Sequence, residues 1–463
     1  MTVEINEILV IMMFLTFISM LFTGYPIALV LGGVAMLFAL VGYLADIYLD
    51  AMTGIDFMYM GMIVNRIFKL MKSWVLVAAP MFIFMGLMLD RSGIAEKMMK
   101  SIQELFGKVR GGLAITVTLI GVILAASTGI IGASVVLLGL LSLPAMLRQG
   151  YQKSLAVGTV CSAGTLGILI PPSVMLVFMA DQLGLSVGDL FMGALFPGLI
   201  LGALYVAFIL IFSMVRPNAA PLSKDRRNLE WRIIWEIFKT ILPPGILIFA
   251  VLGSIFAGVT TPTEASGVGA LGAILLALFN KRLSFKVIKE VTQQTFNTTG
   301  YIFGIFFGAH AFALVLRGLG GDEVIEAALT GLPLGPHGIM AVILGAVFLM
   351  GFFLDWIEIT LIVLPLLAPI ISALGIKIDG YGVIDNPEMV WFAVLVAVSL
   401  QTSFLTPPVG FAIFYLKGVT PPEIKLLDIY RGVIPFVILQ LIGLLAVVVW
   451  PQLVIWLPAL AYG

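Results

Sequence analysis

Two proline pairs, each inside a long hydrophobic segment, limit what this chain can fold into more than any other feature of its sequence. They are Pro171-Pro172 and Pro407-Pro408. Proline has no backbone N–H, so each pair interrupts a helix and leaves backbone carbonyls without helical donors. Bare carbonyls at membrane depth are costly unless protein, an ion or a water-lined cavity satisfies them. Two such breaks in corresponding halves of a chain indicate the binding site of a secondary transporter.

The composition of the chain agrees with a membrane location. Of its 463 residues, 61% are hydrophobic and 11% are charged, which predicts an all-α polytopic integral membrane protein. The single cysteine, Cys161, excludes a disulfide within the chain. The motifs His-Glu-x-x-His and Gly-x-x-x-x-Gly-Lys-Ser/Thr are absent, so we expect no enzyme activity and no organic cofactor. A nominal dinucleotide fingerprint, Gly-x-Gly-x-x-Gly at residues 267–272, has no preceding strand and lies in an apolar helix, where packing explains it. The apolar bulk leaves no basic face for nucleic acid, and we expect none to bind.

Basic residues in short connecting segments predict the orientation of the chain. They place residues 91–110, 216–232 and 281–289 in the cytoplasm. Arg66, Lys69 and Lys72 fall on the opposite side, where they predict an amphipathic helix along the membrane interface.

Each proline pair follows an apolar stretch that is too long for one span. Residues 112–147 are interrupted at 126–129, with both ends predicted in the cytoplasm, and residues 335–374 are interrupted at 351–356, with both ends outside. Each stretch predicts a re-entrant helical hairpin, followed by a transmembrane helix that a proline pair breaks. The two copies have opposite orientations, so the sequence predicts an inverted-topology repeat.

This pattern divides the chain into five predicted segments. They are residues 1–110, the N-terminal spans and interfacial arm of a scaffold; 111–215, the first repeat with hairpin 1 and its broken helix; 216–235, a cytoplasmic loop; 236–298, further scaffold spans and an arm; and 299–463, the second repeat with hairpin 2, its broken helix and a C-terminal span.

Oxygen atoms near the two breaks suit a sodium ion. Sodium is a hard cation, and unwound carbonyls beside hydroxyls bind it without burying a fixed negative charge. The alternative is that the proline pairs are only kinks whose carbonyls are satisfied by nearby Ser or Thr. The candidate ligands are Ser127, Thr128, Gly167, Ile170 and Pro171 in the first half, and Ser403, Thr406 and the hairpin around Gly351 to Asp355 in the second.

Ionisable side chains in apolar runs are further candidates, because they are costly in a membrane and usually functional. Asp355 is either a cation ligand or a helix cap. Glu264 is most simply an acid in the first turn of a helix. His310 is either a substrate or proton contact or a packing residue, and Arg317 either meets an anionic substrate or snorkels to the interface. The candidate substrate contacts are Ser173, His310, Arg317 and Glu358.

Four motifs together resemble the large membrane subunit of TRAP transporters, the DctM family, along essentially the whole chain. They are residues 164–173, the Thr-x-x-Glu-Ala of residues 261–265, residues 351–356, and residues 406–417. In that family the sodium sites lie where the hairpin tips meet the broken helices. The resemblance carries these sites onto Ser127, Thr128, Gly167, Ile170 and Pro171, and onto Gly351, Ser403, Thr406 and Pro407.

The resemblance implies an elevator-type, sodium-coupled importer of an organic acid in the bacterial inner membrane. It implies two partners, a small four-helix membrane subunit (DctQ-like) and a periplasmic solute-binding protein (DctP-like). Two other readings are a stand-alone ion-coupled carboxylate symporter and a membrane scaffold that moves nothing. The doubled helix breaks argue against the scaffold, which gains nothing from exposing carbonyls at mid-membrane.

Overall fold

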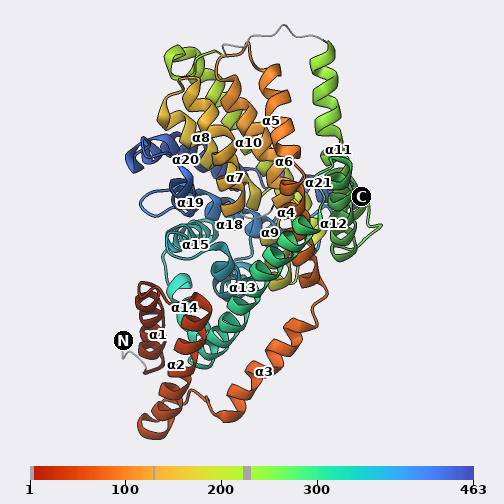
Figure 1. The fold of residues 1–463 in the computed structure, drawn as a ribbon. Helices are drawn as coiled ribbons and strands as arrows, with labels where there is room; N and C mark the ends of the chain where they lie inside the picture. Colours follow the sequence, from red (N-terminus) through yellow and green to blue (C-terminus); the bar gives the residue numbers. More distant parts are fainter. Residues whose placement is uncertain (1–4, 129–130, 223–230, 463) are drawn as a thin grey trace. The chain divides into compact units, whose positions relative to one another are not determined.

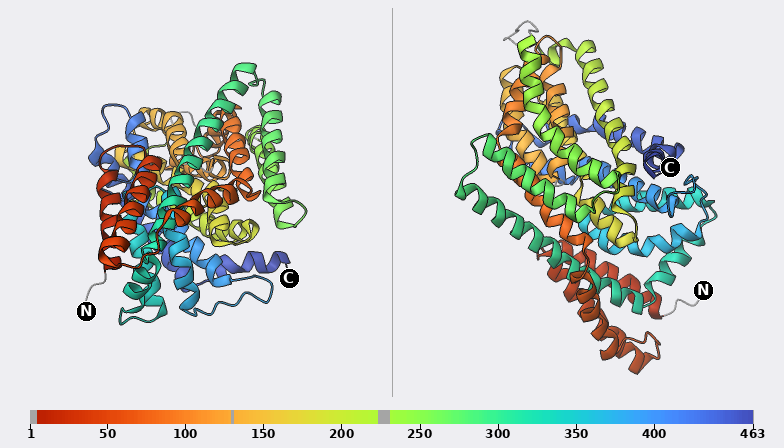
Figure 2. Two further views of the ribbon diagram at one scale, coloured as in Figure 1. Left: turned by 90° about the horizontal axis from the view of Figure 1, so that it is seen from below. Right: turned by 90° about the vertical axis from the view of Figure 1, so that its right-hand side faces the viewer.

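The protein is built from helices, as a computed structural model that describes residues 5–128, 131–222 and 231–462 (Figure 1). Within these ranges the side chains of 125–128 and 232–234 are not described. The ranges contain no strand, and two further views show helices alone (Figure 2). Nine of the described helices are long and apolar enough to cross a membrane. The expectation of an all-α polytopic membrane protein is therefore confirmed.

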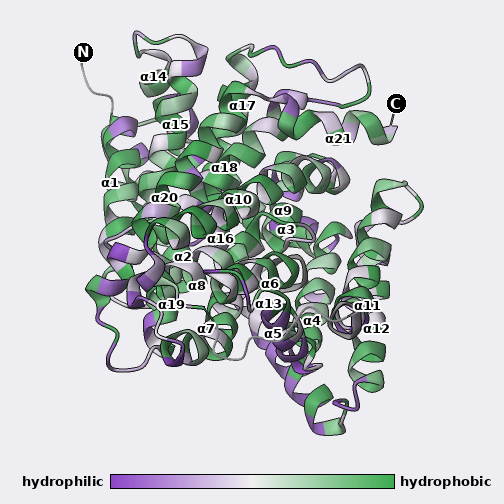
Figure 3. Ribbon diagram, turned by 90° about the horizontal axis from the view of Figure 1, so that it is seen from above, coloured by the Kyte–Doolittle hydropathy of each residue, from purple (hydrophilic) through white to green (hydrophobic). Residues whose placement is uncertain are grey.

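Hydrophobic residues cover most of the helical ribbon (Figure 3). Many large apolar side chains are exposed, as lipid-facing positions require; Phe249, for example, is 79% exposed. The helix labelled α5, Ile94–Leu105, is instead largely hydrophilic in Figure 3. Its buried positions include Ile94, Met98 and Ile102, while Lys97 and Lys100 are exposed. Apolar residues at this spacing give one buried face, so α5 is an amphipathic helix.

The chain forms two compact units, and unit 1 comprises Met1–Trp74, Phe296–Ala346 and Phe353–Lys377. Its elements are α1 (Ile5–Leu21), α2 (Ile27–Leu49), α3 (Phe57–Met71), most of α13 (Phe285–Gly318), α14 (Gly321–Thr330), most of α15 (Pro336–Met350), α16 (Trp356–Glu358), the π-helix Ile359–Val363 and α17 (Leu364–Ala373).

Unit 2 comprises Val75–Thr295, Val347–Phe352 and Ile378–Gly463. Besides α5, its elements are α4 (Ala78–Arg91), α6 (Gly112–Thr128), α7 (Ile131–Arg148), α8 (Lys153–Thr165), α9 (Val174–Leu183), α10 (Val187–Val215), α11 (Trp231–Phe256), α12 (Pro262–Phe279), α18 (Pro387–Leu405), α19 (Phe411–Val419), α20 (Leu426–Val449), α21 (Gln452–Tyr462) and short 3-10 helices at Val75–Val77, Leu166–Ile168 and Pro217–Ala219.

The helix ends agree closely with the predicted hairpins and breaks. The predicted stretch 112–147 forms α6 and α7, which pack together. The predicted stretch 335–374 forms α15 to α17. Each is followed by a pair of helices separated at prolines, α8 with α9 and α18 with α19. Entry of the hairpins from one side of a membrane stays a prediction.

The five predicted segments and the two compact units divide the chain at different places. α4, α5, α11 and α12, expected in a scaffold, share unit 2 with α6 to α10. Most of α13 and of α15, expected in the second repeat, lies in unit 1. The segment boundaries stay a prediction.

Candidate ion and substrate site

The first helix break lies between α8 and α9 and is fully enclosed. A short 3-10 helix, Leu166–Ile168, ends α8, and α9 begins at Val174. The prolines between them, Pro171 and Pro172, are buried and joined by a cis peptide bond. The break is therefore buried in unit 2 rather than a kink at the surface.

Only some of the backbone carbonyls at this break accept a hydrogen bond from the protein. Ser173 donates its hydroxyl to the Ile168 carbonyl at 2.6 Å, which replaces the N–H that Pro172 lacks. The carbonyls of Ile170 and Pro171 accept no hydrogen bond from any donor in the described ranges. Oxygen atoms left in this way suit a hard cation. The carbonyls that make Ile170 and Pro171 candidates are thus available, whereas Ser173 has a structural partner.

Glycines bring three neighbouring helices onto α8 and so position the first break. A Cβ on Gly121 of α6 would lie 2.7 Å from the Cβ of Ala163, and a Cβ on Gly164 would lie 3.0 Å from the Cα of Val135 on α7. A Cβ on Gly158 would collide with the backbone carbonyl of Gly432 on α20. Close backbone contact of this kind is typical of membrane helix interfaces.

The second break lies between α18 and α19 and is more open than the first. Thr406 and Pro407 are half-buried, and Pro408, joined to Pro407 by a cis bond, is exposed. The N–H of Thr406 donates to the Ser403 carbonyl at 3.0 Å, so that carbonyl is already paired. The Thr406 hydroxyl donates to the Thr402 carbonyl at 2.7 Å, which leaves its lone pairs free to accept a donor or bind a cation.

Hairpin 2 reaches the second break through a close contact within unit 2. Ser403 donates its hydroxyl to the carbonyl of Phe348 on α15 at 2.8 Å. A Cβ on Gly351, just beyond the end of α15, would lie 2.5 Å from the Ser403 hydroxyl oxygen. The structure therefore brings together Gly351, Ser403 and Thr406, which the resemblance assigned to one site. Ser127 and Thr128, assigned to the other site, have side chains outside the described part of the chain.

A buried polar cluster between the broken helices was missed by the sequence analysis. Gln401 on α18 is fully buried, and neither polar atom of its amide has a hydrogen-bond partner within the described ranges. Gln440 on α20 points its amide nitrogen to the Thr165 hydroxyl at 3.5 Å, and the Tyr205 hydroxyl of α10 adjoins both glutamines. Buried amides normally have partners. No local sequence pattern could have revealed this cluster, because four separate helices form it.

Asp355 and Glu358 occupy the return of hairpin 2 in unit 1. The Asp355 carboxylate caps α16 by accepting the N–H of Trp356 at 2.8 Å, as the capping alternative expected, and the side chain is half-buried. Glu358 is 1% exposed, and its Oε2 has no partner in the part of the chain described. A π-helix follows it at Ile359–Val363, a feature frequent at functional sites. Glu358 thus has one carboxylate oxygen without a hydrogen-bond partner in the described ranges, and its role as a substrate contact stays a prediction.

His310 and Arg317, both on α13, have partners in unit 1. The Nδ1 atom of His310 lies 3.1 Å from the Phe306 carbonyl, and its ring stacks on that of Phe306. Arg317 forms an ion pair with Asp322 at 3.2 Å and donates to the Pro365 carbonyl at 3.3 Å. Burial raises the pKa of Asp322, and the Arg317 guanidinium opposes that rise. These contacts support the structural alternatives, and a substrate role for either residue stays a prediction.

The donors at the breaks are carbonyl and hydroxyl oxygens. Within the described ranges, no group of three or more His, Cys, Asp or Glu side chains is placed to hold a metal. The available oxygens therefore fit a monovalent hard cation better than a transition metal. A multi-pass all-α membrane protein with two proline-broken helices, each facing unpaired oxygens, has the architecture of a membrane transporter.

The comparison with known families agrees. The family described as "Tripartite ATP-independent periplasmic transporter, DctM component" matches residues 14–453. The chain belongs to this DctM family of TRAP transporter large permeases, and the resemblance seen in its motifs is confirmed.

Individual relatives are distant but align over most of the chain. The C4-dicarboxylate large permease DctM of Pseudomonas aeruginosa is 29% identical over 85% of this chain and 88% of its own length. The isethionate permease DctMQ of Oleidesulfovibrio alaskensis is 27% identical over 93% of this chain and 63% of its own length. The sialic acid large permease SiaM of Vibrio cholerae is 27% identical over 96% of this chain and 97% of its own length.

A solved structure shares the fold. The YdaH transporter of Alcanivorax borkumensis superimposes with a TM-score of 0.56 over 82% of this chain and 85% of its own, at 13% sequence identity. At that identity the likeness concerns the fold alone.

Proposed function

We propose that this chain is the large permease subunit of a tripartite transporter that uses a sodium gradient to import an organic acid across the bacterial inner membrane. The observation that carries the proposal is that both proline breaks belong to unit 2, with free carbonyls at Ile170 and Pro171 and free hydroxyl lone pairs at Thr406. Two oxygen-lined sites in one compact body would move together.

Sodium is the coupling ion in this proposal. At the first break the carbonyls of Ile170 and Pro171 would bind it, with Gly167 and the hairpin residues Ser127 and Thr128 completing the shell. At the second, Thr406 would contribute its hydroxyl, with Gly351, Ser403 and Pro407 forming the wall. Asp355 lies in unit 1, where it caps a helix, so we assign it a positioning role rather than that of a ligand.

The substrate class follows from the relatives. The three relatives above are named for C4-dicarboxylate, isethionate and sialic acid, and each of these carries an acidic group. We infer that this chain also transports a small organic acid. Glu358, with its unpaired oxygen, His310 and Arg317 are candidate substrate contacts in unit 1. Ser173 is a separate candidate in unit 2.

Two partners complete the proposed assembly. One relative carries the name DctMQ, and this chain matches 63% of its length. We therefore propose a small DctQ-like membrane subunit and a DctP-like periplasmic binding protein. Copurification of the small subunit would separate this assembly from a stand-alone carboxylate symporter. Movement of unit 2 as one body would provide the elevator step.

Sodium binding can be tested without knowledge of the substrate. We expect the unfolding temperature of the purified protein to be higher in sodium than in potassium or choline at equal ionic strength. Sodium at about 100 times its dissociation constant should add roughly 2.7 kcal/mol for each site. Thr406→Ala should reduce this gain, because it removes one of the candidate ligands.

Thr116→Ala is the matched control. Like Thr406, Thr116 donates its hydroxyl to the carbonyl four residues earlier, which is that of Gly112 at 2.8 Å. Thr116 lies in the first turns of α6, at the start of hairpin 1, and is not a candidate ligand. If sodium stabilises Thr406→Ala and Thr116→Ala equally, Thr406 is not a ligand. If sodium and choline give the same unfolding temperature for the wild type, the proposed sites do not bind sodium.

A further inference from the structure

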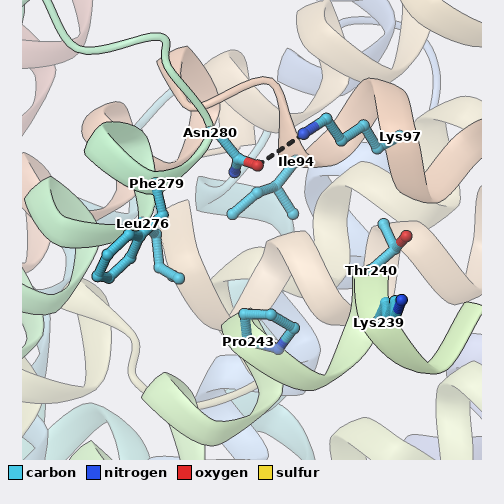
Figure 4. A pocket seen from close by; sticks show the side chains of 8 residues that line it. All are labelled: Ile94, Lys97, Lys239, Thr240, Pro243, Leu276, Phe279 and Asn280. Atoms are coloured by element: carbon cyan, nitrogen blue, oxygen red, sulfur yellow. Dashed lines mark hydrogen bonds between the residues drawn. The ribbon is translucent and has the colours of Figure 1, made fainter. Parts of the chain in front are cut away.

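A pocket of about 310 Å³ lies in unit 2 between α5, α11 and α12, away from both helix breaks (Figure 4). Its polar wall has two sides. On one side Lys97 of α5 donates to the side-chain oxygen of Asn280 at 2.6 Å. On the other side, Lys239 and Thr240 project from the first turns of α11. Two lysines from different helices thus line the same pocket.

Within the part of the chain that the structure describes, the two ammonium groups lack the negative partners that nearby basic residues have. Arg91 pairs with Glu290 at 3.2 Å, and Arg282 pairs with Glu96 at 3.7 Å. In the described ranges no carboxylate forms an ion pair with Lys97 or Lys239. Lys239 lies 5.4 Å from the centre of the Trp235 ring, a contact that does not neutralise its charge. Two uncompensated cations beside Asn280 and Thr240 suit an anion with several acceptor oxygens.

The remaining wall of the pocket is apolar, which restricts the kind of anion. Pro243 of α11 and Leu276 and Phe279 of α12 line it, and Phe279 is 76% exposed. Exposed aromatic side chains on α11 continue this surface, with Trp231 at 77% and Trp235 at 49%. Exposed tryptophans are typical of the level of lipid headgroups. An apolar wall does not stabilise a free phosphate ion, whereas it can pack against the acyl chains of a lipid.

The predicted orientation places this pocket at the cytoplasmic interface. Lys97 belongs to the first of the three basic segments that the sequence assigns to the cytoplasm, α11 begins at Trp231 near the end of the second, and α12 ends at Phe279 just before the third. Within unit 2, α11 packs against α5 and α12, and Arg282 of the third segment pairs with Glu96 of the first, which agrees with their assignment to one side. Basic pockets between membrane helices on that side bind anionic lipid headgroups.

We propose that this pocket binds the headgroup phosphate of an anionic phospholipid between Lys97 and Lys239, with the acyl chains along Pro243, Leu276 and Phe279. The lipid would join α5 to α11 and α12 through its phosphate oxygens. This inference concerns a structural ligand of unit 2 and does not depend on which substrate the protein transports.

Thermal unfolding in mixed micelles tests the proposal. We expect phosphatidylglycerol to raise the unfolding temperature of the wild type, and phosphatidylcholine and soluble inorganic phosphate to leave it unchanged. Removing one lysine should weaken the apparent affinity for phosphatidylglycerol about fivefold, and the double variant Lys97→Gln/Lys239→Gln about 25-fold. Both side chains are exposed, so neither substitution removes core packing.

Lys286→Gln is the control variant, because it makes the same charge change on the same face outside the pocket. Lys286 is 86% exposed and lies 4.0 Å from Glu290. The affinity of the Lys286→Gln protein for phosphatidylglycerol should stay within twofold of that of the wild type. Equal weakening in Lys286→Gln and Lys239→Gln would show a general surface-charge effect and overturn the proposal. So would equal stabilisation by inorganic phosphate, or an unchanged affinity in the double variant.

Discussion

Gly158→Ala should loosen the helix that carries the first break, because α8 and α20 cross there backbone on backbone. The new Cβ would collide with the Gly432 carbonyl oxygen and lie 2.6 Å from the carbonyl carbon and 3.1 Å from the Cα of that residue. All these atoms belong to the backbone, so no side-chain rotation can relieve the contact. The two helices must separate by roughly 1 Å to restore ordinary van der Waals distances.

The expected loss can be estimated from two opposing effects. Inserting a methyl group into a packed interface costs up to about 3 kcal/mol. Alanine favours the helix over glycine by about 1 kcal/mol. The net expectation for Gly158→Ala is therefore a loss of roughly 2 kcal/mol in the free energy of unfolding.

Gly267→Ala on α12 is the matched control. A Cβ at Gly267 would have no atom within 4 Å, so only the gain in helix propensity applies and stability should stay equal or rise. Thermal unfolding followed by the fluorescence of the seven tryptophans measures both variants in the same detergent. A Gly158→Ala protein that melts at or above the wild-type temperature would refute the argued crossing, as would equal shifts in the two variants.

Two further substitutions test the contacts at the second break and in the buried cluster. Gly351→Ala should abolish part of the sodium-dependent stabilisation, because its Cβ would displace Ser403; Gly345→Ala, with open space around its Cβ, should not. An unchanged sodium response in Gly351→Ala would contradict this. Gln401→Leu should keep or raise the unfolding temperature but reduce uptake, because an amide with no partners contributes no hydrogen bond to stability. A fall of several degrees would show that the amide has partners after all.

Local features of the fold followed from the sequence because their causes are local. The proline pairs had to end α8 and α18, and the interruptions at 126–129 and 351–356 fall where α6 and α15 end. Glu264 was expected in a first turn, and it forms a capping box in which Thr261 donates its N–H to the Glu264 carboxylate at 2.8 Å. In each case the residues concerned are close in sequence.

Features that depend on distant residues did not follow. Gln440 and Thr165 are 275 positions apart, and no periodicity links either to Gln401 or Tyr205. Arg317 forms an ion pair with Asp322 and donates to the Pro365 carbonyl within unit 1, contacts that the sequence did not predict, and a substrate role for Arg317 stays a prediction. The π-helix after Glu358 has no signal in a run of β-branched and aliphatic residues.

The two breaks differ in a way that bears on how the sites would be loaded. At the first, Ser173 satisfies one carbonyl, two others lack donors, and Pro171 and Pro172 are buried, so a cation there would be enclosed. At the second, Thr406 is half-buried and Pro408 is exposed, so a cation would meet solvent or lipid unless another element covered it. An enclosed oxygen site loses a cation slowly, and an open one exchanges it easily. We therefore expect Thr406→Ala to change the sodium concentration needed for half-maximal stabilisation through the more open second site. A sodium titration of the wild type that shows two steps would distinguish the two sites directly.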